Sequence, residues 1–486
     1  MLVLEDAALL RSRCYVDGHW IGADDGSFFP VHNPADGSEI ALVPALGVRE
    51  TRRAIEAAVR SWPQWRDRTA EERAALLGRW HGLILRHRED LARIMTAENG
   101  KPLDEARGEV DYGAGFVAWF AAEALRVYGD VIPSPWSRRR IVVLKQPVGV
   151  CAAITPWNYP LSMVTRKCAA ALAAGCTVVV KPASETPLSA LALAELADRA
   201  GIPPGVFNIV TGPAEVIGRE LATHPDIRKL SFTGSTAVGK LLYRQAGDTI
   251  KRLSLELGGN APFIVFEDAD LDAAVEGAMR AKFRNTGQTC VCANRIFVHE
   301  SLYAPFAARL ARKIADLKVG CGFDEGVQQG PLIDEKAVEK VEAQIADAVA
   351  QGAQVVVGGR RHALGGTFFE PTLLTGVKPG MRIMKEETFG PVAPLTAFRD
   401  EAEVIGMAND TEYGLAAFFY TRDLSRTLRV AEALEYGMVG VNAGVISTPV
   451  APFGGMKQSG IGREGSKYGI GEYLEVKYVC LDLRED

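Results

Sequence analysis

The stretch from residue 150 to residue 233 constrains the fold most, because short apolar segments alternate there with helical patterns. The apolar segments lie at residues 150–154, 177–180, 206–210 and 229–233, and the first helical pattern between them is rich in alanine. Near-continuous apolar strands that alternate with helices are typical of a parallel sheet with helices on its faces. We therefore expect an α/β protein with a Rossmann-like body, in which ligands bind at the carboxyl ends of the strands.

Polar residues suited to ligand binding follow three of these strands. Trp157 and Asn158 come after the first strand, and Lys181 and Ser184 after the second. The strand at 229–233 leads into Gly234-Ser235 and a further helix. Glycine-rich turns before helices present free N–H groups to phosphate, but this spacing is not the Gly-x-Gly-x-x-Gly fingerprint, and a tight packing turn explains it equally well. Its place on a Rossmann-like sheet favours nucleotide binding.

Residues 283–292 place Cys290 in a run of small and polar residues. A structural cysteine usually has apolar neighbours, whereas a nucleophilic cysteine needs surroundings that stabilise its thiolate. Taken alone, the pattern fits an inert buried thiol as well as a nucleophile. Glu256 ends an apolar segment beside Gly258 and Gly259, where a mobile carboxylate could act as a base. A solvent-facing glutamate in a turn is the alternative.

Composition and charge exclude several classes of partner. The 486 residues have a formal net charge of −5, which offers no basic face for nucleic acid and no polybasic membrane anchor. No apolar run approaches the ~20 residues of a membrane span, and the start of the chain lacks an export signal. Eight cysteines in a chain of this length form no disulfide framework, so we expect a cytoplasmic protein. No Cys, His and carboxylate cluster has metal-ligand spacing, and no metal is expected.

Six short motifs occur together and in order, and they resemble the NAD(P)-dependent aldehyde dehydrogenase superfamily from about residue 15 to the end of the chain. Within the superfamily, residues 283–294 and 462–469 look most like succinate-semialdehyde dehydrogenases. The six motifs are Trp157-Asn158, Lys181-Pro182, Gly234-Ser235, Glu256-Leu257-Gly258-Gly259, Gly287-Gln288-Thr289-Cys290 and Glu387-Thr388-Phe389-Gly390-Pro391.

The resemblance implies an aldehyde dehydrogenase fold in three parts. A Rossmann-like cofactor domain would comprise residues 1–128 and 148–258, and an α/β catalytic domain residues 259–458. A small β oligomerisation flap and C-terminal segment would comprise residues 129–147 and 459–486. Because a flap strand at a sheet edge would pair with another subunit, we expect a homodimer or homotetramer.

The resemblance also implies roles for the residues of the motifs. Cys290 would attack the aldehyde and pass through a thiohemiacetal and a thioester, while Asn158 stabilises the oxyanion. Glu256 would activate the water that hydrolyses the thioester, with Glu464 as a nearby acid. The expected cofactor-binding residues are Thr155, Pro156, Trp157, Lys181, Pro182, Ser184, Gly234, Ser235, Leu257, Glu387 and Phe389.

The choice of cofactor depends on Ser184. Members of the superfamily that prefer NAD often have a glutamate at this place, where its carboxylate repels a 2′-phosphate. Ser184 leaves room and offers a hydroxyl, with Lys181 nearby as a cation. We therefore expect NADP to be preferred and NAD to remain possible, because Glu185 would disfavour the phosphate if it turned inward.

The substrate expectation depends on Arg166, Arg284 and Ser447, which match the residues that hold the distal carboxylate in succinate-semialdehyde dehydrogenases. An arginine fork suits a carboxylate, although each arginine alone would more often form a surface ion pair. Thr448-Pro449 departs from the family pattern and leaves succinate and glutarate semialdehyde as alternatives.

A broad aliphatic-aldehyde dehydrogenase, which would not need both arginines, is the further alternative. A cysteine hydrolase would need a histidine base that no motif supplies, and a non-catalytic binding protein is disfavoured by the presence of Cys290, Glu256 and Asn158. Cys292 is either a packing residue or the partner of Cys290 in a redox-controlled disulfide.

Overall fold

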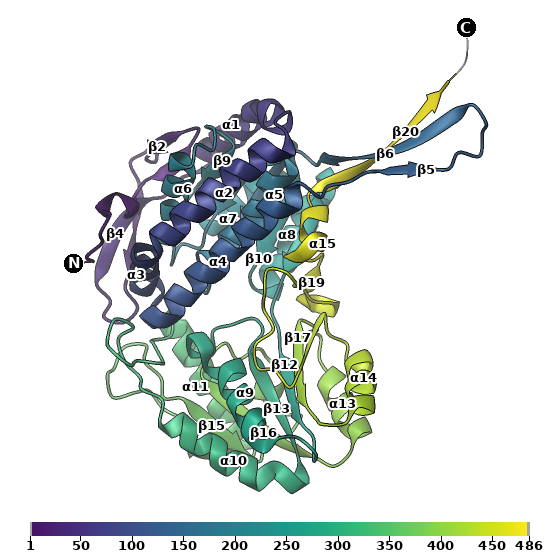
Figure 1. Ribbon diagram of the computed structural model, residues 1–486. Helices are drawn as coiled ribbons and strands as arrows, with labels where there is room; N and C mark the ends of the chain where they lie inside the picture. The colour runs from purple at the N-terminus through teal and green to yellow at the C-terminus, as the bar shows by residue number, and fades with distance from the viewer. Residues whose placement is uncertain (1, 484–486) are drawn as a thin grey trace.

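The computed structural model describes residues 2–483, which form two α/β bodies and a projecting arm (Figure 1). The alternating segments of the sequence form the first sheet, so the expected α/β class is confirmed. Its strand order is β19-β11-β10-β7-β8-β9-β1-β2, and the strands from β11 to β9 run parallel. The strands are β1 (Cys14–Val16), β2 (His19–Ile21), β7 (Val150–Ile154), β8 (Thr177–Lys181), β9 (Phe207–Ile209), β10 (Ile227–Thr233), β11 (Arg252–Glu256) and β19 (Gly460–Ile461).

Helices cover both faces of this sheet. Alternate side chains of β7 are buried on opposite faces of the sheet: Cys151 and Ala153 pack in one apolar cluster, and Val150 and Ala152 pack in another. This is why the strands read as continuous apolar runs rather than as an alternating pattern. The helices of the first body are α1 (Val48–Arg66), α2 (Ala70–Arg86), α3 (Arg88–Asn99), α4 (Leu103–Ala124), α5 (Ser162–Ala174), α6 (Leu188–Arg199), α7 (Ala214–Thr223) and α8 (Thr236–Ala246). A two-stranded sheet of β3 (Phe28–His32) and β4 (Glu39–Pro44) lies before α1.

The second body contains the sheet β14-β15-β16-β13-β12-β17-β18. Alternate residues of β12 again pack in two clusters, Phe263 and Val265 in one and Ile264 in the other. Its strands are β12 (Ala261–Val265), β13 (Ala293–His299), β14 (Gln354–Val357), β15 (Thr372–Thr375), β16 (Val392–Phe398), β17 (Ala416–Tyr420) and β18 (Met438–Val441). Its helices are α9 (Leu271–Phe283), α10 (Glu300–Ala315), α11 (Glu335–Ala350), α12 (Arg382–Lys385), α13 (Glu401–Asn409) and α14 (Leu424–Ala433).

The arm is a three-stranded antiparallel sheet in the order β20-β6-β5 (Figure 1). It consists of β5 (Asp130–Ile132), β6 (Arg139–Pro147) and β20 (Leu474–Asp482). The C-terminal segment is divided, because β19 pairs with β11 in the first sheet, and α15 (Ser466–Gly471) contacts α4 and α5. Only its last strand therefore belongs to the arm.

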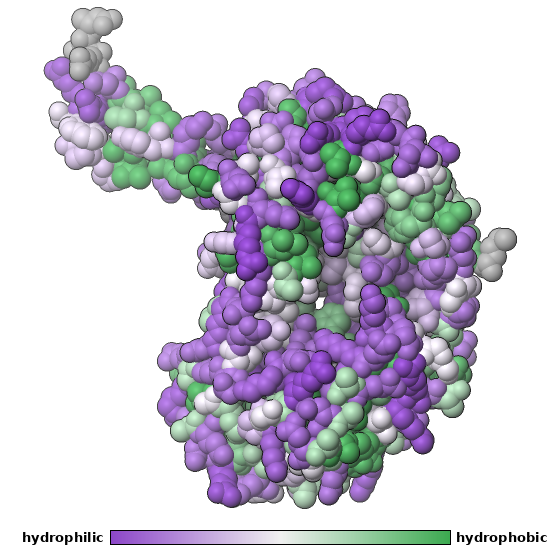
Figure 2. Space-filling view, turned by 180° about the vertical axis from the view of Figure 1, so that it is seen from behind, coloured by the Kyte–Doolittle hydropathy of each residue, from purple (hydrophilic) through white to green (hydrophobic). Residues whose placement is uncertain are grey.

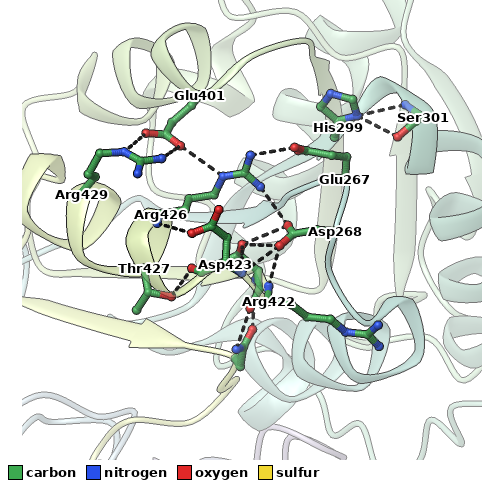
Figure 3. Close-up of polar contacts among 12 residues, drawn as sticks. Glu267, Asp268, His299, Ser301, Glu401, Arg422, Asp423, Arg426, Thr427 and Arg429 are labelled. Carbon is green, nitrogen blue, oxygen red and sulfur yellow. Dashed lines mark hydrogen bonds and ion pairs between the residues drawn. The ribbon is translucent and has the colours of Figure 1, made fainter.

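Hydrogen bonds and ion pairs connect α14 to the residues that follow β12 in the second body (Figure 3). The Arg426 guanidinium contacts Glu267, Asp268 and Glu401 at 2.7, 2.9 and 3.1 Å, and it lies 4.5 Å above the Phe266 ring. Asp268 also accepts the backbone N–H groups of residues 422 and 423. The network positions the outer helices of this body.

Within residues 2–483, no helix is both long and apolar enough to cross a bilayer. The same part of the chain contains no group of three or more His, Cys, Asp or Glu side chains placed to hold a metal ion.

Candidate active site

A cavity of about 330 Å³ brings residues of both bodies together, and the surface is visibly hollowed between the bodies (Figure 2). Cys290 and Asn158 line it. So do seven of the predicted cofactor-binding residues, namely Pro156, Trp157, Gly234, Ser235, Leu257, Glu387 and Phe389. The parallel strands β7, β10 and β11 all end at this edge, which explains why segments distant in sequence meet here.

The loop before Cys290 has an unusual backbone conformation. Asn285, Thr286 and Gly287 have φ values of 50°, 56° and 74°, a left-handed run that costs energy at the two residues with a Cβ atom. A Cβ atom at Gly287 would lie 2.2 Å from the Gly390 carbonyl oxygen, so this loop packs directly on the loop that carries Phe389. A Cβ atom at Gly259 would lie 2.3 Å from the Cys290 carbonyl oxygen. Gly287 and Gly259, from two of the predicted motifs, therefore let three loops approach one another.

Asn158 faces the loop of Cys290. Its side-chain amide donates to the Gln288 carbonyl at 3.0 Å, and the side chain is almost fully buried. The backbone carbonyl of Asn158 accepts from Lys101 at 2.7 Å and from the Asn285 amide at 3.0 Å. These contacts hold the amide next to the sulfur-bearing residue, where a donor could stabilise negative charge on a bound oxygen.

The surroundings of Cys290 raise the pKa of its thiol. Burial raises its pKa to about 12, the negative charge of Glu256 adds to the rise, and Arg166 opposes it. A thiol with this pKa needs a base before it can attack. The stabilisation of the thiolate that the sequence suggested stays a prediction.

Glu256, at the end of β11, is the nearby carboxyl group. Its side chain is 3% exposed, and burial raises its pKa to about 7, with a further contribution from the charge of Glu464. Arg166 lies 3.4 Å from one carboxylate oxygen of Glu256, and its Nε is 2.5 Å from Glu464. The other oxygen of Glu256 has no hydrogen-bond partner among the described residues. A carboxyl group with a pKa near 7 is suited to accept protons at neutral pH.

The remaining predicted cofactor-binding residues lie at the ends of β7 and β8. The Thr155 amide donates to the Lys181 carbonyl at 3.1 Å, and the Lys181 ammonium donates to the Pro182 carbonyl at 3.0 Å. Burial lowers the pKa of Lys181, and the charge of Glu185 opposes the shift. Ser184 is half-buried, and Glu185 is exposed.

Polar groups around this edge are arranged for a bound molecule. The buried hydroxyls of Thr155 and Thr233 have no hydrogen-bond partner among the described residues. Ser235 caps the N-terminus of α8, where free N–H groups favour an anion such as phosphate. Burial raises the pKa of Glu387 to about 7, and its carboxylate accepts from the Gly259 amide at 2.9 Å. The Trp157 and Phe389 rings meet edge to face at 5.4 Å beside it. These residues fit a dinucleotide with a planar ring.

Two of the three predicted substrate-binding residues share a cavity, and the charge of the third, Arg166, acts on Tyr112, which lines that cavity. Arg284 and Ser447 line a second cavity of about 320 Å³. Arg166 does not line it: its side chain is fully buried, lies 4.2 Å above the Phe453 ring and is paired with Glu464. A role of Arg166 toward substrate stays a prediction, and its observed contacts are with Glu256 and Glu464.

Cys290 and Cys292 are both free thiols. Cys292 is fully buried and its sulfur contacts the Lys282 carbonyl at 3.4 Å, whereas Cys290 lines the first cavity. The packing function of Cys292 is therefore visible, and its redox partnership with Cys290 stays a prediction.

Sequence reasoning missed several residues that surround these groups. Lys167 contacts Glu464 and is fully buried on α5. The signal for Lys167 was its place next to Arg166 inside an alanine-rich buried helix, because buried charges are paired. Tyr112 and Tyr159 line the second cavity, and only the position of Tyr159 next to Asn158 hinted at it.

Comparisons with known proteins agree with this arrangement. Residues 20–479 match the aldehyde dehydrogenase family. A glutarate-semialdehyde dehydrogenase of Pseudomonas aeruginosa is 61% identical over 478 residues, 98% of this chain and 99% of the relative. The NADP(+) succinate-semialdehyde dehydrogenase GabD of Escherichia coli is 59% identical over 480 residues, 99% of this chain and 100% of the relative. A crystal structure described as an E. coli NADP-dependent enzyme superposes with a TM-score of 0.99 at 59% identity, covering 99% of this chain and 100% of that one.

Proposed function

Because the chain belongs to the aldehyde dehydrogenase family, we propose that it oxidises short aldehydes with a distal carboxylate, succinate semialdehyde first, with NADP or NAD. The observation that carries this proposal is that Cys290 and Asn158 line one cavity with Glu387 and Phe389, while Glu256 lies near enough for its charge to raise the pKa of the Cys290 thiol. Glutarate semialdehyde is the second candidate, because a relative of the same similarity carries that name.

The chain's own residues account for the covalent steps. Glu256 removes the proton of the Cys290 thiol, and the sulfur attacks the aldehyde carbon. The Asn158 amide and the Cys290 backbone N–H donate to the oxygen that becomes negative. After oxidation, Glu256 activates the water that hydrolyses the thioester on Cys290 and releases the acid. A carboxyl group with a pKa of about 7 can serve in both proton transfers at neutral pH.

The residues at the carboxyl ends of β7, β8 and β10 would hold the cofactor. Lys181 and Ser184 would bind the adenosine ribose or its 2′-phosphate, Ser235 a phosphate, and Glu387 the nicotinamide ribose. The bound nicotinamide supplies the hydride acceptor of the reaction. NADP is the preferred form in this proposal, since Ser184 offers a hydroxyl and Lys181 a cation at this edge.

Arg284 would bind the distal carboxylate of the substrate, with Ser447 beside it in the second cavity. Burial removes water from the guanidinium and disfavours its charged form. Hydrogen bonds to a bound carboxylate compensate for the lost water. We also propose that the protein is cytoplasmic and that it forms a homodimer or a homotetramer.

The first experiment measures initial rates of NADPH and NADH formation with succinate semialdehyde, glutarate semialdehyde and butanal. Wild type should prefer both semialdehydes to butanal by a large factor in kcat/KM, and Arg284→Ala should remove that preference. Arg280→Ala, at an exposed arginine of α9 four residues before Arg284, is the matched control and should behave as wild type. Equal rates with butanal in wild type would show a broad aliphatic-aldehyde dehydrogenase instead.

A further inference from the structure

The second cavity contains two tyrosines beside Arg284. It is lined by Tyr112 of α4, Tyr159 of the loop after β7, Arg284 and Ser447, together with the acidic residues Glu105 and Glu109. Tyr112 packs edge to face on Phe116 with ring centroids 4.9 Å apart. The Tyr159 ring lies 4.2 Å from the Lys101 ammonium. Both rings are thus held in place by neighbouring side chains.

The hydroxyl groups of both tyrosines are buried and donate to no acceptor among the described residues, and Arg284 Nε has no hydrogen-bond partner among them. Arg166 acts on Tyr112 both through its charge and through a hydrogen bond to the hydroxyl, and both effects lower the pKa that burial raises. A guanidinium can only donate, so this contact with Arg166 still leaves the hydroxyl proton without an acceptor. Buried polar groups without partners are rare in proteins and call for an explanation.

The two carboxylates of the cavity do not supply the missing acceptors. Glu109 already binds Lys101 at 2.5 Å and accepts the backbone N–H groups of residues 161 and 162, each at 3.1 Å. Glu105 accepts the Asn285 amide at 2.7 Å, and burial raises its pKa. The unsatisfied groups of the cavity are therefore donors, and they need a ligand that accepts without donating.

We propose that the Tyr112 and Tyr159 hydroxyls donate hydrogen bonds to the distal carboxylate of the substrate together with Arg284, and so determine its specificity. This inference rests on the proposed function, because it assigns the carboxylate of that substrate to this cavity. A carboxylate has about four acceptor sites on two oxygens, enough for the two hydroxyls and one guanidinium. Two neutral donors also add affinity without adding charge to a cavity that already contains Arg284.

Electrostatics support the assignment. Burial raises the pKa of both tyrosines, so each hydroxyl keeps its proton at any pH at which the enzyme works. The pKa of each tyrosine is lowered by the charge of Arg284 and raised by a thiolate at Cys290, so both tyrosines lie near the guanidinium and the nucleophile. A short ω-carboxylate aldehyde bound to Cys290 would extend toward these tyrosines.

The test compares Tyr112→Phe, Tyr159→Phe and the double variant with wild type on succinate semialdehyde, glutarate semialdehyde and butanal. Loss of one hydrogen bond to a charged group should raise KM for the semialdehydes about tenfold, and more in the double variant, while kcat/KM for butanal stays within about threefold. The same variants should weaken binding of succinate, measured by calorimetry without turnover. Tyr128→Phe, at a tyrosine that is 68% exposed, is the matched control.

The outcomes separate this inference from the proposed function. If wild type shows no preference for semialdehydes over butanal, the substrate proposal itself fails. If wild type prefers semialdehydes and binds succinate, but all tyrosine variants keep both properties, the hydroxyls do not bind the carboxylate. Equal loss of activity on butanal and semialdehydes would show that the tyrosines only support the fold, and would likewise overturn the inference.

Discussion

Two charged neighbours act in opposite directions on the pKa of Glu256: the negative charge of Glu464 raises it, and the guanidinium of Arg166 lowers it. Burial and the charge of Glu464 raise its pKa to about 7, so it is protonated in acid and becomes a base as the pH rises through neutrality. We expect kcat/KM to rise with pH around this value, because the pH profile of kcat/KM reports groups of the free enzyme.

Glu464→Gln should move that midpoint to lower pH. The variant removes a like charge that raises the pKa of Glu256, and it leaves Arg166 without its closest carboxylate partner. Both changes favour ionised Glu256, so the variant should retain activity at a more acidic pH than wild type. The measurement is kcat/KM from about pH 5 to 9 with the preferred semialdehyde. Glu432→Gln, an exposed residue of α14, should leave the profile unchanged; an unmoved midpoint in Glu464→Gln would show that the two carboxylates are not coupled.

For the individual residues of the site, the sequence predicted which residues are present but not which side chains they contact. Cys290, Asn158 and seven predicted cofactor residues could be found because short motifs carry them, and they do line one cavity. The environment of Arg166 could not be predicted in this way, since its contacts with Glu256 and Glu464 join α5 to β11 and to the segment before α15. A raised pKa depends on burial in three dimensions, which a motif does not encode.

At the scale of elements, the strands of the first sheet were predictable within a few residues because each is an apolar run between turns. The apolar spacing of residues 71–100 is helical throughout and does not reveal the break at residue 87 that separates α2 from α3. Helix α4 was missed, since it contains Gly108, Gly113 and Gly115, which weaken its helical pattern. This omission is the reason that Tyr112 escaped notice.

The network around Asp268 gives a prediction about stability (Figure 3). Burial would raise the pKa of Asp268, but hydrogen bonds from Thr421 and residue 422 and the charge of Arg426 outweigh it, so the pKa is lowered. Asp268→Asn should cost about 1–3 kcal/mol, because charged hydrogen bonds to both the backbone and Arg426 weaken.

Thermal unfolding checks this, and the midpoint of the second body should fall by several degrees at neutral pH. Since the folded pKa is depressed, the stabilisation exists above the ordinary aspartate pKa and is lost as pH falls through the folded value. The difference between wild type and variant should accordingly shrink in acid. Asp272→Asn removes an exposed ion pair with Arg309 and should change little; an equal effect of both variants would contradict the prediction.

The arm is the feature that matters at the scale of the whole molecule (Figure 1). Side chains alternate between its two faces, and both faces carry apolar residues. Val131 pairs with Val142 and Val142 with Val479 across one face, while Ile132, Ile141 and Cys480 form the corresponding row on the other. Apolar residues gather along this projecting sheet in Figure 2. A small sheet that exposes apolar residues on both faces is typical of an interaction surface. The family resemblance implies that another copy of the chain covers it.

Val131→Asp should therefore shift the protein to a smaller assembly. Val131 is 77% exposed on β5, an edge strand of the arm, and a carboxylate there would lose its hydration if a second copy covered the face. Sedimentation velocity over a range of concentrations measures the change, with wild type expected as a dimer or tetramer. Leu428→Asp places the same charge at a residue of α14 that is 61% exposed and far from the arm, and it should not alter assembly. A monomeric wild type, or an unchanged Val131→Asp variant, would mean that the arm does not join subunits through this face.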